Sequence, residues 1–469
     1  MLEAAKPAAA GESCARRLQD HMLSVLLCPQ KPTLTNLISV GGGQQQDWSA
    51  HYRLYSKERM DEEVLFQAAL HEVLSALPDS SPLCIALDDT LVRKCGTHIE
   101  GVSWRRDPLG PAFQTNLVRG QRYLQMSAAW PLATGAARMV PVVFEHAPSA
   151  PKAPKGADET QLAEHREAKR QMCLNAYALK QMARVREITP EQRRVIFCGD
   201  GSYTNSTITR NLPAACTYIG RIRKDAKLHH LPAISTQEKV NGRPTRYGKP
   251  APTPEELRCD ELIPWQQVRA FAAGKTHHFR IKTLDQVLWR KSGTKKVVRV
   301  VVIAPLGYRL RKGNRLLYRL PSFLICTDPQ LPVEELLQYY LWRWGIEVNF
   351  RDEKTLLGAG EAQVRTAASN RHLPAMIVAA YSLLWVAALR LHAQGNLPPG
   401  VQPPKWRTKK ILDPHALPAT ADLLRTLRYE MWAQALRPGS FYHFTHRQKP
   451  NTKSPKPSPN LPGALLDVA

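Results

Sequence analysis

The chain has 469 residues, 43% of them hydrophobic, and carries a formal net charge of +25 at pH 7. A chain of this length and hydrophobic content can bury a large core, divided between two or three domains, and the composition excludes a disordered protein. The excess of lysine and arginine indicates a polyanionic partner, with nucleic acid as the first candidate and a membrane surface as the second.

The sequence shows no signal for secretion or for membrane insertion. No apolar run approaches the roughly eighteen residues of a transmembrane helix. The nine cysteines are scattered without a C-x-x-C pair, which is typical of reduced thiols and of neither zinc ligands nor a disulfide framework. We therefore expect a cytoplasmic protein with no membrane partner.

Residues 1–80 are predicted to form a helical N-terminal segment. Apolar residues recur with a period of 3.6 in residues 61–77, as in an amphipathic helix. Two interpretations stay open for this segment: a small DNA-binding module, or a helical lid.

The pattern changes to strands at residue 81. The run 83-LCIALDDT-90 is continuously apolar until it ends in two aspartates, and 193-RRVIFCGD-200 repeats this pattern. Further elements are predicted at 122–130 and 139–145, as strands, and at 158–187, as a long amphipathic helix. This order predicts an α/β core over residues 81–214, with Asp88 and Asp200 at the carboxyl ends of strands, where open α/β sheets place their sites.

The second half of the chain is predicted to contain an insertion, the rest of the core and a tail. Residues 215–330 are expected to be β-rich, because strand-like runs alternate with basic, glycine-containing turns. The core is expected to resume over residues 331–395, with helices at 332–357 and 373–393. Residues 396–469 are predicted to be a basic, proline-rich tail with one helix at 419–436.

The helix predicted at 332–357 carries a polar stripe. At roughly 100° per residue, four side chains fall within about 60° of one another: Tyr340, Arg343, Glu347 and Lys354. Trp344 is expected on the neighbouring, buried flank. A solvated face on which Arg343, Glu347 and Arg351 pair at spacings of four would give the same pattern.

Asp88, Asp200 and Glu347 together predict a cluster of carboxylates. Like charges at close range raise one another's pKa, so such a cluster needs a counter-charge. Two Mg²⁺ ions about 3.5–4 Å apart would supply it and would activate phosphodiester chemistry. A phosphodiester substrate agrees with the basic composition.

These residues resemble the DDE transposases of bacterial insertion sequences, in particular the insertion-sequence-four type. The C-terminal signature of that type is Tyr, two residues, Arg, three residues, Glu, six residues, Lys, and Tyr340, Arg343, Glu347 and Lys354 meet every spacing. The two aspartate motifs are matched by 88-DDT-90 and 197-FCGDGSYTN-205. The resemblance covers roughly residues 80–395.

The resemblance implies an RNase H-like catalytic core interrupted by the β-rich insertion. It implies that Asp88, Asp200 and Glu347 form the catalytic triad and bind two Mg²⁺ ions, for which Mn²⁺ can substitute. Asp89 stays open as the alternative to Asp88, in case the register of the strand differs by one residue.

The resemblance also implies which residues contact DNA. Tyr340, Arg343 and Lys354 would contact phosphates at the end of the element, with Arg351 beside them. Trp265 or Trp289 could stack on a flipped base, although each would more often be a core tryptophan. The basic clusters 221-RIRK-224, 309-RLRKGNR-315 and 405-KWRTKK-410 suit a phosphate backbone.

The resulting hypothesis is a DNA transposase that binds the terminal inverted repeats of its own element, cleaves the ends and joins them to target DNA. Two ends must react together, so a DNA-bridged homodimer is expected. Its contact is expected on the C-terminal helix, at Leu423, Leu424, Leu427 and Trp432. The alternatives are a catalytically silent descendant that only binds DNA, and an RNase H-like nuclease or resolvase.

Overall fold

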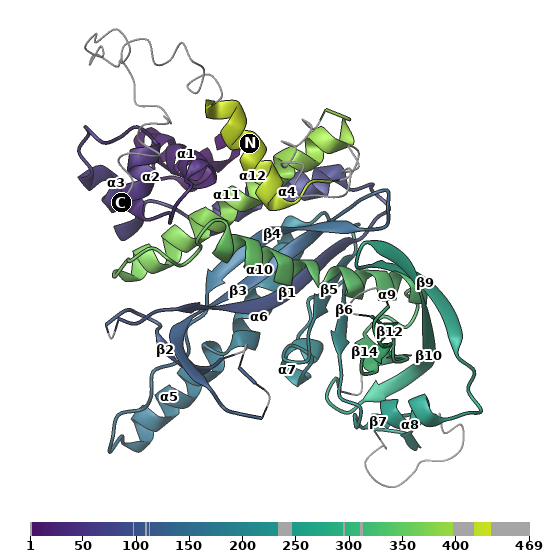
Figure 1. Ribbon diagram of the computed structural model, residues 1–469. Coiled ribbons are helices and arrows are strands. Elements are labelled where there is room, and N and C mark those ends of the chain that lie inside the picture. The colour runs from purple at the N-terminus through teal and green to yellow at the C-terminus, as the bar shows by residue number, and fades with distance from the viewer. Residues whose placement is uncertain are drawn as a thin grey trace.

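The computed structural model describes residues 2–96, 98–107, 110–111, 113–232, 246–293, 296–309, 313–396 and 417–432. In this part of the chain, twelve strands form one mixed sheet, and helices pack against it (Figure 1). The fold is therefore mixed α/β, as predicted.

Five strands form the core of the sheet, in the order β4-β3-β1-β5-β6. They are β1 (Leu83–Arg93), β3 (Leu117–Pro131), β4 (Ala137–His146), β5 (Val195–Gly199) and β6 (Cys216–Arg221). β3 runs antiparallel to β1 and β4, whereas β5 and β6 run parallel to β1. The continuous apolar runs in β1 and β5 are buried because both faces of the sheet are covered there. This is the RNase H-like core that the resemblance implied.

The β-rich insertion continues the same sheet. β14 (Ser322–Cys326) pairs antiparallel with β6, and β11 (Val297–Ile303), β10 (Lys275–Trp289) and β9 (Gln266–Ala272) follow outward. The insertion also has its own apolar cluster, which includes Val287, Val298 and Phe323. The insertion is thus joined to the core through backbone hydrogen bonds at the edge of β6.

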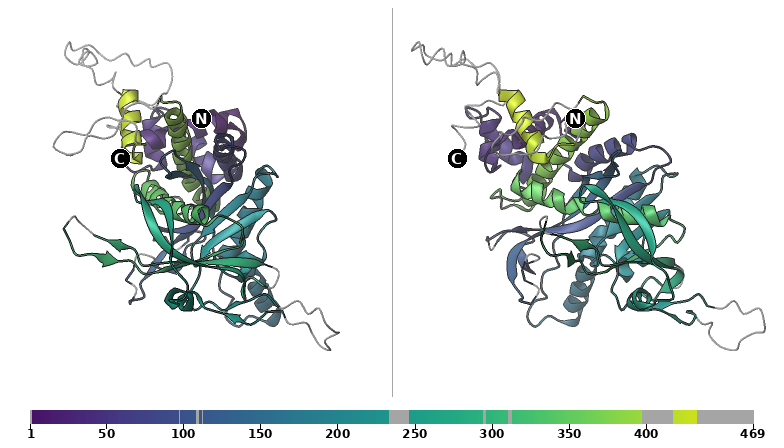
Figure 2. Two further views of the ribbon diagram at one scale, coloured as in Figure 1. Left: turned by 90° about the vertical axis from the view of Figure 1, so that its right-hand side faces the viewer. Right: turned by 45° about the vertical axis from the view of Figure 1, so that its right-hand side comes forward.

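Shorter elements complete the two ends of the sheet. They are β2 (Ser103–Arg106), α7 (Ser206–Arg210), β7 (Leu228–His229), β8 (Pro250–Ala251) and α8 (Pro254–Cys259). β12 (Gly307–Tyr308) and β13 (Leu317–Tyr318) form a separate two-stranded sheet, which projects from the body in Figure 2. Residues 313–315 of the basic cluster at 309–315 belong to the turn between these two strands, and residues 310–312 lie outside the described part of the chain.

The N-terminal segment is helical, as predicted. It contains η1 (Leu2–Ala8), α1 (Glu12–Leu27), α2 (Leu34–Val40), α3 (Ser49–Ser56) and α4 (Glu62–Ala76). α4 begins where the Asp61 side chain accepts hydrogen bonds from the backbone N–H groups of Glu63 and Val64, with acidic residues in the first turn. Residues of α1 and α4 share one apolar cluster with α11 (Ala367–Ala393), so the segment is part of the main core.

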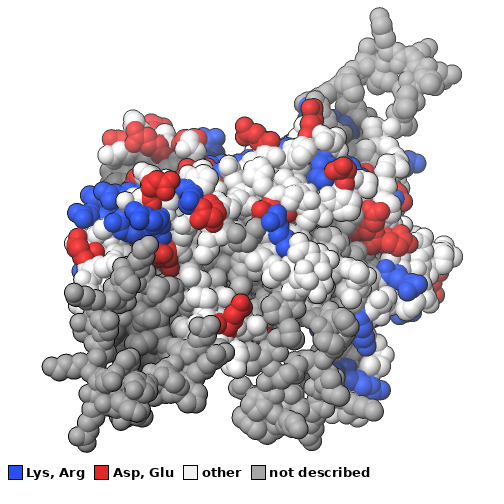
Figure 3. All heavy atoms as spheres, turned by 90° about the horizontal axis from the view of Figure 1, so that it is seen from above, with Lys and Arg blue, Asp and Glu red and all other residues white. Residues whose placement is uncertain are grey.

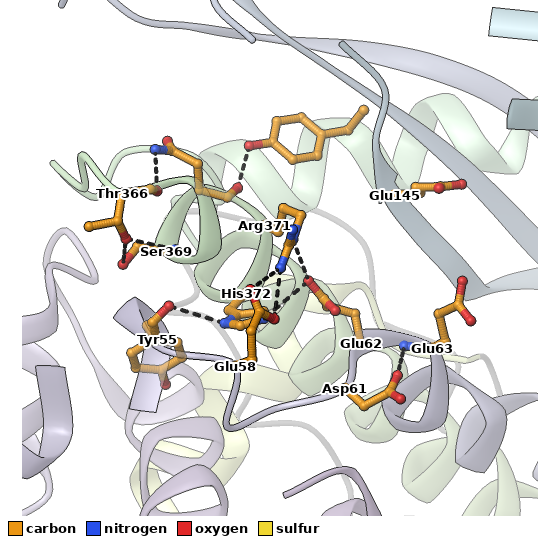
Figure 4. A network of polar contacts seen from close by, with 12 residues as sticks. Tyr55, Glu58, Asp61, Glu62, Glu63, Glu145, Thr366, Ser369, Arg371 and His372 are labelled. Atoms are coloured by element: carbon orange, nitrogen blue, oxygen red, sulfur yellow. Dashed lines mark hydrogen bonds and ion pairs between the residues drawn. The ribbon is translucent and has the colours of Figure 1, made fainter. Parts of the chain in front are cut away.

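Polar contacts also hold the N-terminal helices on α11 (Figure 4). The Arg371 guanidinium donates to both carboxylate oxygens of Glu58, at 2.6 and 2.8 Å, and lies 3.6 Å from Glu62. Nδ1 of the buried His372 imidazole lies 3.1 Å from the carbonyl oxygen of Tyr55. Seen from above, this side of the molecule shows acidic and basic side chains mixed together (Figure 3).

α11 is the central helix of the core. By length and composition it could cross a membrane, but 89% of its most apolar window is buried inside the protein. The Thr366 side chain caps its N-terminus by accepting a hydrogen bond from the Ser369 N–H. The helix thus begins at Ala367, six residues before the predicted start. The apolar composition is thus explained by burial in the protein core.

Two helices that were predicted as continuous are each divided in two. The charged helix at 158–187 is α5 (Glu159–Gln171) followed by α6 (Leu174–Ile188), and the helix at 332–357 is α9 (Val333–Trp342) followed by α10 (Gly345–Thr355). Between α9 and α10, the N–H groups of Arg343 and Trp344 bond three residues back, to Tyr340 and Leu341, in a tighter 3₁₀-type turn.

A close approach accompanies the turn between α9 and α10. A Cβ atom at Gly345 would lie 2.5 Å from Cγ of Met139 on β4, so a glycine lets α10 approach the sheet. The turn also places Trp344 on the surface with 61% exposure. The expectation that Trp344 lies on a buried flank is therefore wrong, because the 3₁₀-type turn at Arg343 and Trp344 interrupts the α-helical periodicity on which it rested.

The C-terminal helix α12 (Thr420–Trp432) packs against α1 of the same chain. Leu423, Leu424 and Trp432 are at most 9% exposed, and Leu427 packs beside them. The Arg428 guanidinium donates to the carbonyl oxygens of Leu26 and Cys28, at 3.0 and 2.7 Å. The predicted dimer contact is therefore wrong, because the N-terminal helices of the same chain already cover these side chains.

Candidate functional site

Asp88 and Asp200 occupy neighbouring positions on two parallel strands. In the pairing of β1 with β5, Ala86 lies opposite Cys198, and each aspartate follows two residues later. Adjacent strands are about 4.8 Å apart, so the two carboxylates lie close together. Asp200 follows the end of β5 as expected, but Asp88 lies inside β1, because pairing with β3 continues past it to Arg93.

Glu347 is brought to Asp88 by Arg343. Arg343 lies in the turn between α9 and α10, and its Nη1 is 3.2 Å from Oδ2 of Asp88 while its Nη2 is 3.3 Å from Oε1 of Glu347. The Arg343 side chain is only 12% exposed. One guanidinium group thus connects the central strand to the first turn of α10, and Asp200 follows the neighbouring strand at the same end of the sheet.

Asp88 and Asp89 face opposite sides of the sheet, as successive residues of a strand do. Asp89 accepts a hydrogen bond from the Tyr203 hydroxyl at 3.2 Å. Burial raises the pKa of Asp89. Asp88 is the member of the pair that contacts Arg343, so the geometry favours it over Asp89 as the partner of Glu347.

The site has an excess of negative charge. Burial and the neighbouring Asp200 carboxylate raise the pKa of Asp88 to about 7, although Arg343 opposes this shift. Burial alone would lower the pKa of Arg343, but Tyr340, Asp88, Glu347 and Asp200 outweigh it and the pKa is raised. A further positive charge would therefore be stabilised here.

The donor chemistry of the three carboxylates fits a hard divalent cation, since they offer oxygen ligands only. Among the residues that the structure describes, no group of three or more His, Cys, Asp or Glu side chains is arranged to hold a metal ion. Arg343 lies between two of the three carboxylates. The residues thus fit the cation in chemistry and charge, with an arginine bonded to two of the ligands it would use.

The other residues of the polar stripe differ in position. The Tyr340 ring centroid lies 5.8 Å from Cζ of Arg343, beside the carboxylates. Lys354 donates from Nζ to the Leu91 carbonyl oxygen at 2.9 Å, and burial lowers the pKa of this lysine. Arg351 is exposed and pairs with Asp352 at 2.8 Å. The structure therefore brings Tyr340 and Arg343 to the site and places Lys354 in one groove with Asp88 and Glu347, while Arg351 pairs with its neighbour Asp352.

A large groove extends from the site toward the insertion. It has a volume of about 1510 Å³ and contains Asp200, Tyr340 and Arg343 in its wall. Eight further cations line it, and we call it the basic groove: Arg210, Arg221, Arg223, Lys224, Lys227, Arg258, Arg290 and Lys291. The sequence indicated only the cluster at 221–224, because the other cations are far apart in the chain and meet only through the sheet.

A second groove, of about 1040 Å³, lies beside Asp88, Asp89 and Glu347. Two of its cations have protein partners: Lys94 donates to the carbonyl oxygens of Gly360 and Ala362, and Arg93 pairs with Asp107. Arg223 and Arg258 in the basic groove are paired in the same way, with Asp225 and Glu255. The second groove is lined by five Lys or Arg and five Asp or Glu residues, whereas the basic groove is lined by nine and three, so the basic groove is the better binding surface for a polyanion.

Trp265, Trp289 and Trp344, of which the sequence singled out the first two for base stacking, differ in exposure. Trp289 is 5% exposed within the insertion core, although it also lines the basic groove, so the alternative of a core residue fits it better than base stacking. Trp265 is partly buried, with Nζ of Lys282 4.7 Å from its ring centroid. Trp344, which follows Arg343 in the chain, is exposed, although it lines neither groove. The sequence missed it because the predicted continuous helix buried it.

One comparison with known families gives a match. A family model described as DDE superfamily endonuclease matches residues 10–296. This range includes the N-terminal helices, Asp88 and Asp200, and it ends before α9 and Glu347. No curated protein matches the chain.

Proposed function

This chain belongs to the DDE superfamily endonucleases, and from that premise we propose that it is a transposase of the insertion-sequence-four type. It would cleave DNA at the ends of its mobile element and transfer the freed strands to target DNA. The observation that supports it is that Arg343 bridges Asp88 and Glu347 at the end of the sheet where Asp200 follows β5, and that Arg343 and Asp200 line the basic groove.

The basic groove would bind the DNA of the terminal inverted repeats. Its eight cations share one groove with Asp200 and Arg343, so a duplex held there by its phosphates would bring one phosphodiester close to the carboxylates. Phosphate contacts set the position of DNA but carry no sequence information directly. The residues that read the repeat sequence would therefore be others than these cations.

At the site, Asp88, Asp200 and Glu347 would hold two divalent cations, Mg²⁺ or Mn²⁺. When bound, such ions supply an activated nucleophile and stabilise the leaving oxygen. Tyr340 and Arg343 lie where the basic groove meets these carboxylates and would position the reacting phosphate. The exposed Trp344 ring would stack on a base near the cleavage point.

Cleavage of a plasmid that carries the DNA flanking this gene tests the proposal. We expect nicks at the boundaries of terminal inverted repeats in Mg²⁺ or Mn²⁺, binding without cleavage in Ca²⁺, and no cleavage in EDTA. Cleavage that persists in EDTA would exclude the metal-dependent mechanism. Tight binding to the repeats without any cleavage would indicate a silent, DNA-binding descendant, and cleavage without regard to the repeats would indicate a nuclease.

The working enzyme would be a DNA-bridged homodimer, because two ends must be cut and joined together and one chain has one such site. Two chains of net charge +25 repel each other until phosphates neutralise them. Light scattering with and without an end duplex tests this. Strand transfer by a particle that holds a single protein chain would exclude the dimer.

A further inference from the structure

Arg343 is bonded to carboxylate oxygens that a divalent cation would also need. Its two terminal nitrogens lie 3.2 Å from Oδ2 of Asp88 and 3.3 Å from Oε1 of Glu347. Mg²⁺ binds carboxylate oxygens at about 2.1 Å, so the ion and the guanidinium group would compete for the space between the two side chains. The fork of a guanidinium group suits such a bridge, because it can donate to two acceptors at once.

The bridge leaves Arg343 incompletely bonded. Its Nε is buried and has no hydrogen-bond partner within the described residues. A buried donor without a partner costs about 1–3 kcal/mol, so this position of the side chain is not its best possible one. A new acceptor, such as a phosphate oxygen, would therefore gain a hydrogen bond from this side chain that the bridge leaves unmade.

The Arg343 side chain also borders the basic groove, where a second position of its guanidinium would meet DNA. Arg343 and Tyr340 both line the basic groove, together with Arg221, and the Arg343 guanidinium is already within 5.8 Å of the Tyr340 ring. A phosphate in the groove would accept hydrogen bonds from the same fork that now holds the two carboxylates. A short rotation of one side chain thus exchanges carboxylate partners for a phosphate partner.

From this geometry we infer that Arg343 is a placeholder that couples cation binding to DNA binding. Without a divalent cation, the guanidinium holds Asp88 and Glu347 together. When a cation takes those oxygens, the guanidinium moves to a phosphate in the basic groove. Cation and DNA therefore strengthen each other's binding, and this coupling is reciprocal. The inference rests on the proposed function, since it takes the ligands to be a divalent cation and DNA.

Calcium binding to the full chain, measured by titration calorimetry without DNA, tests the placeholder. Arg343→Lys keeps the positive charge but cannot bridge both carboxylates with a fork, and Arg343→Gln removes the charge. We expect Arg343→Lys to bind Ca²⁺ about tenfold more tightly than the wild type, and Arg343→Gln at least as tightly. Arg170→Gln, which removes an exposed charge on α5, should leave the affinity unchanged.

DNA binding gives the second measurement. We expect Ca²⁺ to tighten the binding of an end duplex to the wild type severalfold, and to do so much less in Arg343→Lys. If Arg343→Lys binds Ca²⁺ like the wild type while Arg343→Gln binds it more tightly, the effect is charge alone and the placeholder is wrong. If no variant and no wild-type protein binds Ca²⁺, although circular dichroism shows folded chains, the metal-binding part of the proposed function fails as well.

Discussion

At the scale of single residues, the decisive feature is how differently neighbouring side chains are placed. Asp88 and Asp89 are adjacent, yet only Asp88 contacts Arg343, because the pleat turns Asp89 to the other face. The sequence left this pair open, since it could not fix the register of β1. Similarly, Trp344 is exposed although its sequence position predicted a buried flank, and Trp289 is buried although it was a candidate for base stacking.

Trp344 leads to a prediction about DNA binding. Its ring is 61% exposed beside Arg343, so Trp344→Ala should remove a stacked base and weaken binding of end DNA by about tenfold, with little change in the melting temperature. Fluorescence anisotropy measures the affinity. Tyr429→Ala, which removes a 60% exposed aromatic on α12, is the matched control. Equal losses in both variants would mean that Trp344 has no special role.

Glu353 leads to a prediction about pH. This carboxyl is 2% exposed on α10 and accepts a hydrogen bond from Gln125, and burial raises its pKa to about 8. Because the folded pKa is raised, the wild type loses stability as pH rises from about 4.5 to about 8. Glu353→Gln avoids this loss. Its free energy of unfolding should therefore exceed that of the wild type by about 2 kcal/mol at pH 8 and should equal it at pH 4.

Urea unfolding at the two pH values checks this. The substitution Glu353→Gln also changes the partner of the Gln125 side chain. Gln125→Ala, measured beside it, therefore shows the cost of losing this hydrogen bond. A Glu353→Gln chain that is less stable than the wild type at pH 8 would mean that this carboxylate is ionised and needed in the folded protein.

At the scale of elements, the strands were predictable and the turns in the helices were not. β1 and β5 are continuous apolar runs, and such runs identify central strands directly. The division between α9 and α10 was not predictable, because the apolar pattern looks helical on both sides of it. The close approach at Gly345 is to Met139, which lies 206 residues earlier in the chain. Long-range contacts of this kind have no local pattern in the sequence.

The packing of α12 on α1 gives a prediction about stability. Leu424 is 2% exposed between these helices, so Leu424→Ala should destabilise the protein by about 2–4 kcal/mol. Met431→Ala, at a 41% exposed position of the same helix, should cost far less. Urea unfolding compares the two. A destabilised Met431→Ala beside an unaffected Leu424→Ala would mean that α12 presents its other face to α1.

At the scale of the whole molecule, the net charge of +25 favours DNA binding only where cations lie together on one surface. The face seen from above mixes acidic and basic side chains (Figure 3). The basic groove instead brings cations from α7, from β6 and from the residues after β10 to the site. Composition predicted a nucleic-acid partner but could not locate the surface, because its cations come from segments that the sheet brings together. The cluster at 405–410 lies outside the described residues.

The groove gives a prediction about salt. Arg290→Ala with Lys291→Ala should weaken end binding and reduce the slope of log affinity against log salt by about two, because each cation releases one counterion when it contacts a phosphate. Lys169→Ala with Arg170→Ala removes the same charge from exposed positions on α5 and should leave the slope unchanged. Equal slopes for both double variants would place the DNA elsewhere.

The most direct test of the central claim, that the three carboxylates cut DNA held in the basic groove, is Glu347→Gln. This substitution keeps the size of the side chain and its place beside Arg343, but it removes a charged oxygen ligand. Cleavage of labelled end duplex in Mg²⁺ and binding of the same duplex in Ca²⁺ are measured on one preparation. We expect cleavage to fall at least about a hundredfold while end binding stays within a few-fold of the wild type. Cleavage at the wild-type rate would contradict the account.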